Sequence, residues 1–369
     1  MNGGGRYEAL SARLDRLDAA GLRRHLKLVT PGDGLEVTVD GRRATLWCSN
    51  DYLGLADHPD LVRAYRGGGA GAARLVSGNR PAHVALEEAL STLHGRPATL
   101  FPSGYHANLA LYTTVLQAGD IAASDALNHA SIIDGLRLSR ATRHILPHGD
   151  AASVPAAARL VAVEGLYSMD GDMPPLARYP TGPWLAVDDA HAVGALGPDG
   201  LGAAAAQGVE PDFLVGTLGK AYGVAGAFVV GPPALRELLI SAGRAFVYTT
   251  GMPAGVAAAA LEGIRLADEA RREQLAANVR RFREGLHKVG ILTRGEAHIV
   301  PVLTGPATMT AAAALLDEGI YVAGIRYPTV PRGEERLRFT VCAAHTADQI
   351  DRCVEAVARV VVGAAPGRP

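Results

Sequence analysis

The stretch DFLVGTLGKAYGVAGAFVVG, residues 212–231, decides the fold. Two apolar runs, 213–217 and 227–230, flank a glycine-rich segment that carries Lys220. Short apolar runs of this kind predict buried strands in a sheet that is covered on both faces. A lysine beside such strands is partly removed from water, which lowers its pKa and makes the neutral amine available for a Schiff base. Taken alone, the segment favours the alternative of a lysine in a surface loop.

Similar apolar runs occur along residues 60–260, and helical segments separate them. Strands that alternate with helices predict an α/β fold, with a mostly parallel central sheet wrapped by helices. The expected strands are 98–101, 121–124, 160–164, 184–187, 213–217 and 227–230.

The two ends of the chain predict smaller units. Leucines at three- to five-residue spacings predict an amphipathic helix over 7–29, and LEVTVDGRRATLWC (35–48) predicts a hairpin that turns at Asp40-Gly41. A long helix is expected from Pro253 to about Arg271.

The pattern of residues 275–363 predicts the order helix–strand–helix–strand–helix, which indicates a smaller C-terminal α/β domain. The expected division is an N-terminal helix and hairpin at 1–48, a large domain at 49–260 and a small domain at 261–369. The tail GAAPGRP is expected to lack regular structure.

The composition is that of an ordinary globular protein. Of the 369 residues, 48% are hydrophobic and 20% are charged, and the formal net charge is -1, so no general attraction to nucleic acid or to an anionic membrane is expected. No apolar run approaches the roughly 20 residues that span a bilayer. The scattered cysteines Cys48, Cys342 and Cys353 favour reduced thiols in a cytoplasmic protein over a disulfide framework or a metal site.

Polar residues follow most of the expected strands. In parallel-sheet proteins, ligands bind at the carboxyl ends of the strands. The polar residues at these ends are Ser103-Gly104-Tyr105, Asn128-His129, Glu164 with Ser168, Asp188 with His191, and Thr217 with Lys220. Together they predict one site that is assembled from several strand ends.

The segment LAVDDAHAVGALG supplies an acidic group that could act together with Lys220. Asp188 follows a strand too apolar to hold a charge without a partner. Pyridoxal phosphate (PLP) needs a carboxylate beside its pyridine nitrogen, and His191 could bond the phenolic oxygen of the same ring. The alternative is that Asp188 or Asp189 is a helix N-cap, and the segment alone does not decide between them.

Other segments could hold the rest of such a ligand. In FPSGYHAN (101–108), a helix that begins near Tyr105 would offer free N–H groups to a phosphate, and Ser168 and Thr217 could add hydroxyls. His129 could stack on a flat ring, although a structural histidine is the commoner case.

Arg336 and Arg338 lie on one face of an expected strand. A buried arginine suits the carboxylate of an amino acid, whereas an edge-strand pair would face solvent. In combination, the lysine, aspartate, histidine, phosphate donors and arginine make a complete PLP site for an amino acid.

At this point the sequence resembles a known family, the α-oxoamine synthases, which are PLP enzymes of the aspartate-aminotransferase-like fold (fold type I). The resemblance runs from about residue 8 to residue 360. The blocks that carry it are SNDYLGL (49–55), RLVSGN (74–79), FPSGYHAN (101–108), NHASI (128–132), EGLYSMDGDMPPL (164–176), VDDAH (187–191), GTLGKAYG (216–223), YTTGMP (248–253) and YPTVPRGEERLR (327–338).

The resemblance implies a role for each residue around the cofactor. Lys220 would be the Schiff-base lysine, Asp188 the partner of the pyridine nitrogen, His191 the contact to the ring oxygen and His129 the stacking residue. The residues that would hold the ring or its phosphate are Gly104, Tyr105, Ser168 and Thr217. In a homodimer with shared sites, Thr249 and Thr250 would reach the phosphate of the neighbouring subunit.

The resemblance also implies the substrate contacts. Arg338 would bind the amino-acid carboxylate, Thr329 would lie on the substrate loop and Asn50 would belong to the subunit interface. Arg23 would meet the far carboxylate of a pimeloyl chain, with Arg24 as a near competitor.

The implied activity is a decarboxylative condensation of an amino acid with an acyl thioester of coenzyme A or a carrier protein. Arg23 and the compact length favour alanine and pimeloyl thioester, the pair used in biotin biosynthesis. Family members that use glycine or serine with other acyl groups are the main alternative. Two further alternatives are a PLP aminotransferase and a non-catalytic partner subunit. The YPTVP and SNDYLG blocks argue against the first, and the intact catalytic residues argue against the second.

Overall fold

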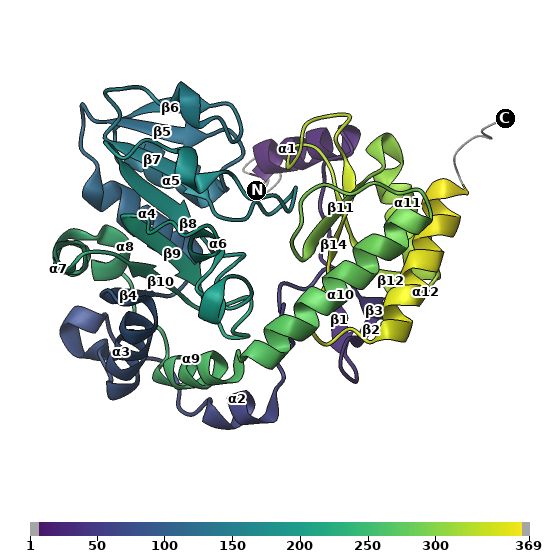
Figure 1. Ribbon diagram of the computed structural model, residues 1–369, viewed down its shortest axis with the longest axis horizontal. Helices are drawn as coiled ribbons and strands as arrows, with labels where there is room; N and C mark the ends of the chain where they lie inside the picture. The colour runs from purple at the N-terminus through teal and green to yellow at the C-terminus, as the bar shows by residue number, and fades with distance from the viewer. Residues whose placement is uncertain (1–6, 364–369) are drawn as a thin grey trace, which may run out of the picture.

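The structure is a computed structural model that describes residues 7–363, so the expected tail lies outside the described residues except for Gly363. Within this range the chain forms three sheets, and the largest has the strand order β4-β10-β9-β8-β7-β5-β6 (Figure 1). Its strands are β4 (Ala98–Phe101), β5 (Ile121–Asp125), β6 (Thr142–Leu146), β7 (Leu160–Glu164), β8 (Trp184–Asp188), β9 (Phe213–Thr217) and β10 (Ala227–Val230).

The large sheet is mostly parallel, which confirms the predicted fold class. Strands β9, β8, β7, β5 and β6 run in the same direction, and β10 runs antiparallel to both β9 and β4. All six expected strands are present. The sequence analysis missed β6, whose residues 142–145 are exposed at the edge of the sheet.

Helices cover both faces of this sheet, which explains why its strands read as continuous apolar runs. Side chains such as Ala122 and Ala162 pack on one face, and Ala123 and Val163 pack on the other. The first face is covered by α4 (Gly104–Val115), α5 (Ala130–Leu138), α7 (Pro233–Ala242) and α8 (Arg244–Val247), and α6 (Ala203–Ala206) packs on the second. Beside β4 lie α2 (Pro59–Ala64), α3 (Pro81–His94) and α9 (Ala254–Leu266).

The parallel strands end in polar residues at one edge of the sheet. The last residues of β5, β7, β8 and β9 are Asp125, Glu164, Asp188 and Thr217. Glu164 and Asp188 are paired directly across neighbouring strands. The strand order therefore places the predicted site residues together at the carboxyl edge.

The remaining two sheets are built from the two ends of the chain. One has the order β11-β14-β13, and the other has the order β1-β2-β3-β12. Their strands are β1 (Val29–Pro31), β2 (Glu36–Val39), β3 (Arg42–Leu46), β11 (Ile299–Leu303), β12 (Ile320–Tyr321), β13 (Ala323–Ile325) and β14 (Arg336–Thr340), and the helices beside them are α10 (Glu269–Lys288), α11 (Thr308–Asp317) and α12 (Ala347–Val357).

The predicted hairpin is confirmed as β2 and β3, which pair around Asp40 and Gly41. Both turn residues have positive φ, 47° and 87°, which suits a tight hairpin turn. On its other side β3 pairs in parallel with β12, so residues near the C-terminus complete the N-terminal sheet. Trp47 then packs against Phe282, with ring centroids 4.9 Å apart.

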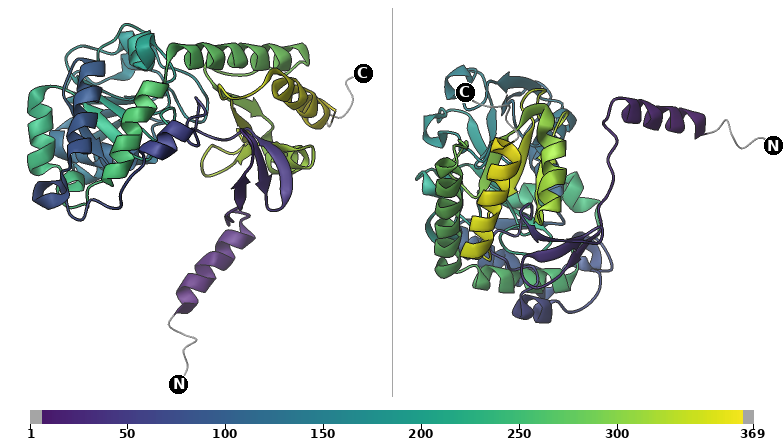
Figure 2. Two further views of the ribbon diagram at one scale, coloured as in Figure 1. Left: turned by 90° about the horizontal axis from the view of Figure 1, so that it is seen from below. Right: turned by 90° about the vertical axis from the view of Figure 1, so that its right-hand side faces the viewer.

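The predicted helix over 7–29 is wrong in its length, because α1 spans only Glu8–Ala19. Gly21 adopts a left-handed conformation, and the N–H of Leu22 donates to the carbonyl oxygen of Leu17 at 2.7 Å. This is a Schellman motif, which ends a helix. None of the residues of α1 is buried, and the helix projects away from the rest of the molecule (Figure 2).

The long helix expected over 253–271 is also wrong, because the chain forms two helices, α9 and α10. Asp268 ends the first and caps the second, with its carboxylate accepting the N–H of Arg271 at 3.0 Å. Among residues 7–363, every helix falls short of the length and apolarity that a membrane-spanning segment needs.

Candidate active site

Lys220 lies in the turn between β9 and β10, at the carboxyl edge of the large sheet. Burial lowers the pKa of its amine to about 8, and the nearby carboxylates of Asp188 and Glu164 limit the shift. A lysine in this state can be a nucleophile or a base near neutral pH.

This pKa sets the pH dependence of cofactor capture. Only the neutral amine can attack an aldehyde, so the rate at which the apoprotein captures PLP should rise about tenfold per pH unit below pH 8 and level off above it. Stopped-flow absorbance from pH 6 to 10 measures this rate. Pyridoxine phosphate, which has no aldehyde, is the control and should bind without this dependence. A midpoint near 10.5, the ordinary value for lysine, would contradict the assignment.

Asp188 and Asp189 have different roles. Asp188 Oδ2 accepts from Asn108 Nδ2 at 2.6 Å, and Oδ1 accepts from the N–H of Ala190 at 3.1 Å. Asp189 is fully buried, and its Oδ2 accepts the N–H of Ala204, in the first turn of α6, at 3.2 Å. The alternative that one of these aspartates is a helix N-cap is therefore wrong, because the N-cap of α6 is Gly202 and Asp189 contacts the first turn of that helix from another segment.

His191 is hydrogen-bonded to a tyrosine that the sequence did not mark as a site residue. Its Nδ1 lies 2.5 Å from Oη of Tyr52, which also donates to Oδ1 of Asn50 at 3.3 Å. Tyr52 packs against His298, with ring centroids 4.0 Å apart and ring planes tilted by 47°. Burial, followed by the charge of Lys220, lowers the pKa of His191 well below its usual value, so this ring is neutral.

His129 begins α5 and is held by Glu164. The main-chain N–H of His129 donates to Oε1 of Glu164 at 2.6 Å. Burial raises the pKa of Glu164 well above its usual value, and Asp188 on the neighbouring strand raises it further. Burial also lowers the pKa of His129, so a neutral ring lies next to Lys220 and Asp188.

The start of α4 can bind an anion. Ser103 caps the helix and its Oγ accepts the N–H of His106 at 3.3 Å. No described residue accepts from the N–H groups of Gly104 and Tyr105, and a side chain at Gly104 would meet nothing within 4 Å. Open space in front of unpaired N–H groups at a helix start suits a phosphate.

Two of the predicted cofactor contacts, the hydroxyls of Tyr105 and Thr217, are occupied within the chain, whereas Ser168 is engaged through its main-chain carbonyl. The hydroxyl of Tyr105 donates to Asp134 at 2.5 Å, and that of Thr217 donates to the carbonyl oxygen of Gly226 at 3.0 Å. The carbonyl oxygen of Ser168 accepts from the guanidinium of Arg338.

Arg336 and Arg338 are both buried on the central strand of their sheet, so the alternative of a solvent-facing edge pair is wrong. Arg336 forms ion pairs with Asp170 at 2.5 Å and Glu334 at 3.1 Å. Arg338 has no ion pair with any described carboxylate. It is therefore the arginine whose charge remains available for a ligand.

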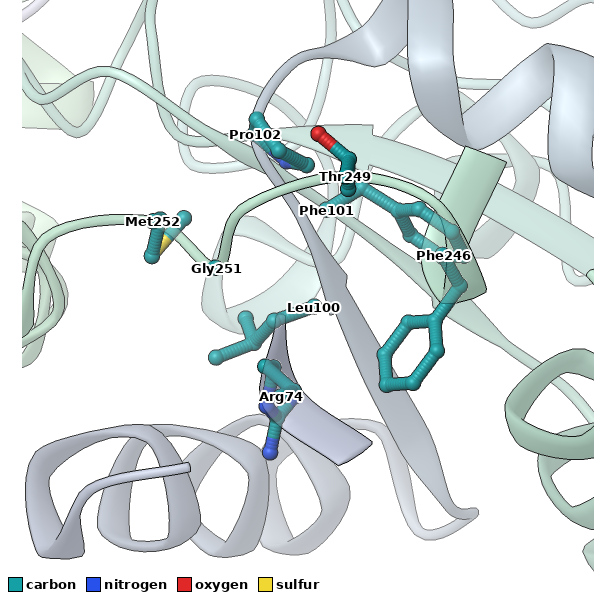
Figure 3. A pocket seen from close by; sticks show the side chains of 8 residues that line it. All are labelled: Arg74, Leu100, Phe101, Pro102, Phe246, Thr249, Gly251 and Met252. Atoms are coloured by element: carbon teal, nitrogen blue, oxygen red, sulfur yellow. The ribbon is translucent and has the colours of Figure 1, made fainter. Parts of the chain in front are cut away.

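The other predicted residues lie outside this cluster. Arg23 forms an ion pair with Asp18 at 2.5 Å, whereas Arg24 donates to Oγ1 of Thr329 at 3.2 Å. Thr249 lines a small cavity of about 10 Å³, and its hydroxyl donates to the carbonyl oxygen of Thr250 at 3.4 Å (Figure 3). The other residues that line this cavity are Arg74, Leu100, Phe101, Pro102, Phe246, Gly251 and Met252.

The residues at this edge fit PLP. Lys220 would bind its aldehyde carbon, Asp188 would face its ring nitrogen and the N-terminus of α4 would hold its phosphate. The neutral rings of His129 and His191 would contact the pyridine ring without adding charge, and Arg338 leaves a cation free for a substrate carboxylate.

Comparison with known proteins agrees with this geometry. Residues 42–357 match the family model of aminotransferases of class I and II. The 8-amino-7-oxononanoate synthase of Halorhodospira halophila is 45% identical over 97% of this chain and 96% of its own.

Two solved structures have the same fold. A serine palmitoyltransferase from S. paucimobilis, solved with a bound PLP–myriocin adduct, is 30% identical over 98% of this chain and 99% of its own, with a TM-score of 0.89. The 8-amino-7-oxononanoate synthase of Francisella tularensis is 27% identical over 87% and 98% of the two chains, with a TM-score of 0.76. The chain therefore belongs to the aminotransferase class I and II family, and within it to the α-oxoamine synthases, which are PLP-dependent acyltransferases.

Proposed function

We propose that this enzyme condenses L-alanine with a pimeloyl thioester of coenzyme A or a carrier protein, and releases CO2, the free thiol of the carrier and 8-amino-7-oxononanoate for biotin biosynthesis. The observation that carries the proposal is the juxtaposition of the desolvated amine of Lys220 with buried Arg338, which has no carboxylate partner within residues 7–363. Relatives that are 40–45% identical over nearly the whole chain bear the name of this activity.

Each residue of the site has one task in this reaction. PLP, when bound, supplies an electron sink for the bond that breaks at the α-carbon of alanine. Arg338 binds the α-carboxylate, and Nζ of Lys220 takes and returns the α-proton, since its pKa lies close to neutrality. The carboxyl group of Asp188 would face the ring nitrogen. His129 would cover the ring, and His191, held by Tyr52, would contact its oxygen.

The proposal is tested by thiol release from the purified, PLP-loaded enzyme. Alanine, glycine and serine are each paired with pimeloyl, acetyl, succinyl and palmitoyl thioesters. Release with alanine and pimeloyl thioester alone is the expected result. Release with a different pair would keep the reaction and change the substrate.

The second candidate is a relative of serine palmitoyltransferase, which condenses serine with a long acyl chain. The observation that favours it is the TM-score of 0.89 with that enzyme, against 0.76 with the F. tularensis synthase. Palmitoyl thioester with serine is the pair that would support it.

Arg23 and Arg24 are proposed to select the acyl chain by meeting its far carboxylate. The ion pair between Arg23 and Asp18 is exposed, so its exchange for a substrate carboxylate costs little. Arg23→Ala should raise the KM for pimeloyl thioester about 10- to 100-fold and leave kcat within about twofold, because a charge-assisted hydrogen bond contributes about 1.5–3 kcal/mol. Acetyl thioester, which lacks this carboxylate, is the control substrate.

Arg24→Ala is the matched variant, because Arg24 contacts Thr329 on the proposed substrate loop. If Arg24→Ala raises this KM and Arg23→Ala does not, the role passes from Arg23 to Arg24. An unchanged KM in both variants would show that the N-terminal segment does not take part in selecting the acyl chain.

We further propose a cytoplasmic homodimer in which Thr249 and Thr250 serve the site of the neighbouring subunit. Exposed apolar side chains near these threonines, Val76 at 80% and Tyr248 at 75%, support a protein interface. The three unpaired cysteines support a reducing compartment. Analytical ultracentrifugation gives the oligomeric state, and mixing Lys220→Ala with Thr250→Ala subunits tests whether sites are shared.

A further inference from the structure

Asn108 lies on α4 and has no role in the reaction described above. Its side chain is buried, with 1% exposed. The amide nitrogen donates to Oδ2 of Asp188 at 2.6 Å and to Oγ of Ser131 at 2.9 Å. These acceptors belong to β8 and α5, so one amide group bridges two elements of the site.

The hydrogen bonds continue from Ser131 to His129. Oγ of Ser131 accepts from Asn108, so its own hydrogen is available to Nδ1 of His129, which lies 2.7 Å away. The main-chain N–H of Ser131 donates to the same nitrogen at 3.2 Å. Nδ1 is therefore an acceptor, and the neutral ring of His129 carries its proton on Nε2.

We propose that Asn108 is a positioning residue that holds Asp188 and His129 as one unit around the cofactor. Asp188 would face the ring nitrogen and His129 would cover the ring, so both must keep their orientation together. Asn108 fixes Asp188 directly and His129 through Ser131. The inference rests on PLP binding at this site and not on the identity of the acyl thioester.

The unpaired oxygen of Asn108 argues against a role in packing alone. Oδ1 is buried and has no partner among the described residues. A buried acceptor without a donor is unfavourable, and a leucine of similar size would pack without that cost. The two hydrogen bonds made by Nδ2 are what an asparagine adds at this position.

The test is a double-mutant cycle on PLP binding, with Asn108→Leu, Ser131→Ala and the double variant. The dissociation constant is measured by absorbance as the apoprotein is titrated with PLP. Asn108→Leu should weaken binding about 10- to 100-fold, as expected for the loss of a hydrogen bond to a charged group. The double variant should bind no more weakly than Asn108→Leu, because the bonds lie in series. If the losses of PLP-binding free energy in the two single variants added up in the double variant, the proposal would be overturned.

A second readout needs no cofactor and no substrate. In the 15N NMR spectrum of the apoprotein, His129 should carry its proton on Nε2, and Asn108→Leu should shift the Nδ1 signal although Asn108 is linked to His129 only through Ser131. Tyr112→Phe is the matched control, because Tyr112 lies one turn further along α4 with a buried hydroxyl that has no partner among the described residues.

An unchanged Nδ1 signal in Asn108→Leu would contradict the network even if PLP binding fell. If the unmodified protein did not bind PLP, the proposed function would fail while the NMR result still decided the network. Thermal unfolding of each apoprotein shows that the variants are folded. Should Asn108→Leu not fold, Ser131→Ala alone must shift Nδ1 and weaken PLP binding.

Discussion

Lys220→Ala is expected to abolish thiol release, with a loss of about 10³-fold or more. The variant removes both the amine that binds PLP covalently and the base that takes the α-proton, and a positioned base alone contributes about 10²–10⁴-fold. The absorbance band of lysine-bound PLP should disappear as well. Steady-state thiol release and the absorbance spectrum of the PLP-loaded protein measure the two effects.

The composition of the chain makes this assignment simple to check. The sequence contains three lysines, Lys27, Lys220 and Lys288, and the other two are exposed. Borohydride reduction followed by peptide mass spectrometry should therefore place the cofactor on Lys220. Lys288→Ala is the matched control and should leave activity and spectrum unchanged. A cofactor band that persists in Lys220→Ala would overturn the assignment of this site.

Asp188→Asn is expected to lower kcat by about 10²- to 10³-fold. The change keeps the size of the side chain and removes the charge that would face the ring nitrogen of PLP. Breaking a buried charge pair in this way costs about 3–5 kcal/mol, and each 1.36 kcal/mol corresponds to a factor of ten in rate. Thiol release and the PLP dissociation constant are the measurements.

Asp189→Asn is the matched control because it alters the next carboxylate in the chain. Asp189 accepts a hydrogen bond from the first turn of α6, and burial raises the pKa of its carboxyl to about 7. Its replacement should leave kcat within about threefold, and its effect should be seen in thermal unfolding. Equal losses of activity in the two variants would mean that the two aspartates do not have separate roles.

Much of the large sheet could be predicted because its strands are buried on both faces. Strands such as 160–164 and 213–217 are apolar up to their last residue, and this pattern is visible without a structure. The strand over 142–146 could not be found in the same way, since it lies at the sheet edge and carries Arg143 and His144. The helix over 8–19 was overextended because the leucine spacing continues to Leu22, past the glycine that ends the helix.

The site residues that could be predicted are those that follow directly after a strand in the sequence. Asp188 and Lys220 each follow a strand, so a sequence pattern places them at one edge. Tyr52 and His298 gave no such signal, because they come from distant segments that only the folded chain brings together. Asn108 belongs to the segment FPSGYHAN, but its two acceptors, at the end of β8 and in α5, could be identified only from the folded chain.

The parallel pairing of β3 with β12 has a consequence for synthesis on the ribosome. The paired residues Leu46 and Tyr321 are about 275 residues apart, which takes about 14–55 s to translate at roughly 5–20 residues per second. Until β12 emerges, β3 is an unpaired edge strand of a sheet that consists only of β1, β2 and β3, and such an edge can pair with another chain. Arg42 and Arg43 on that strand disfavour its association with other nascent chains. The N-terminal hairpin is thus among the first parts of the protein to be made and among the last to be completed.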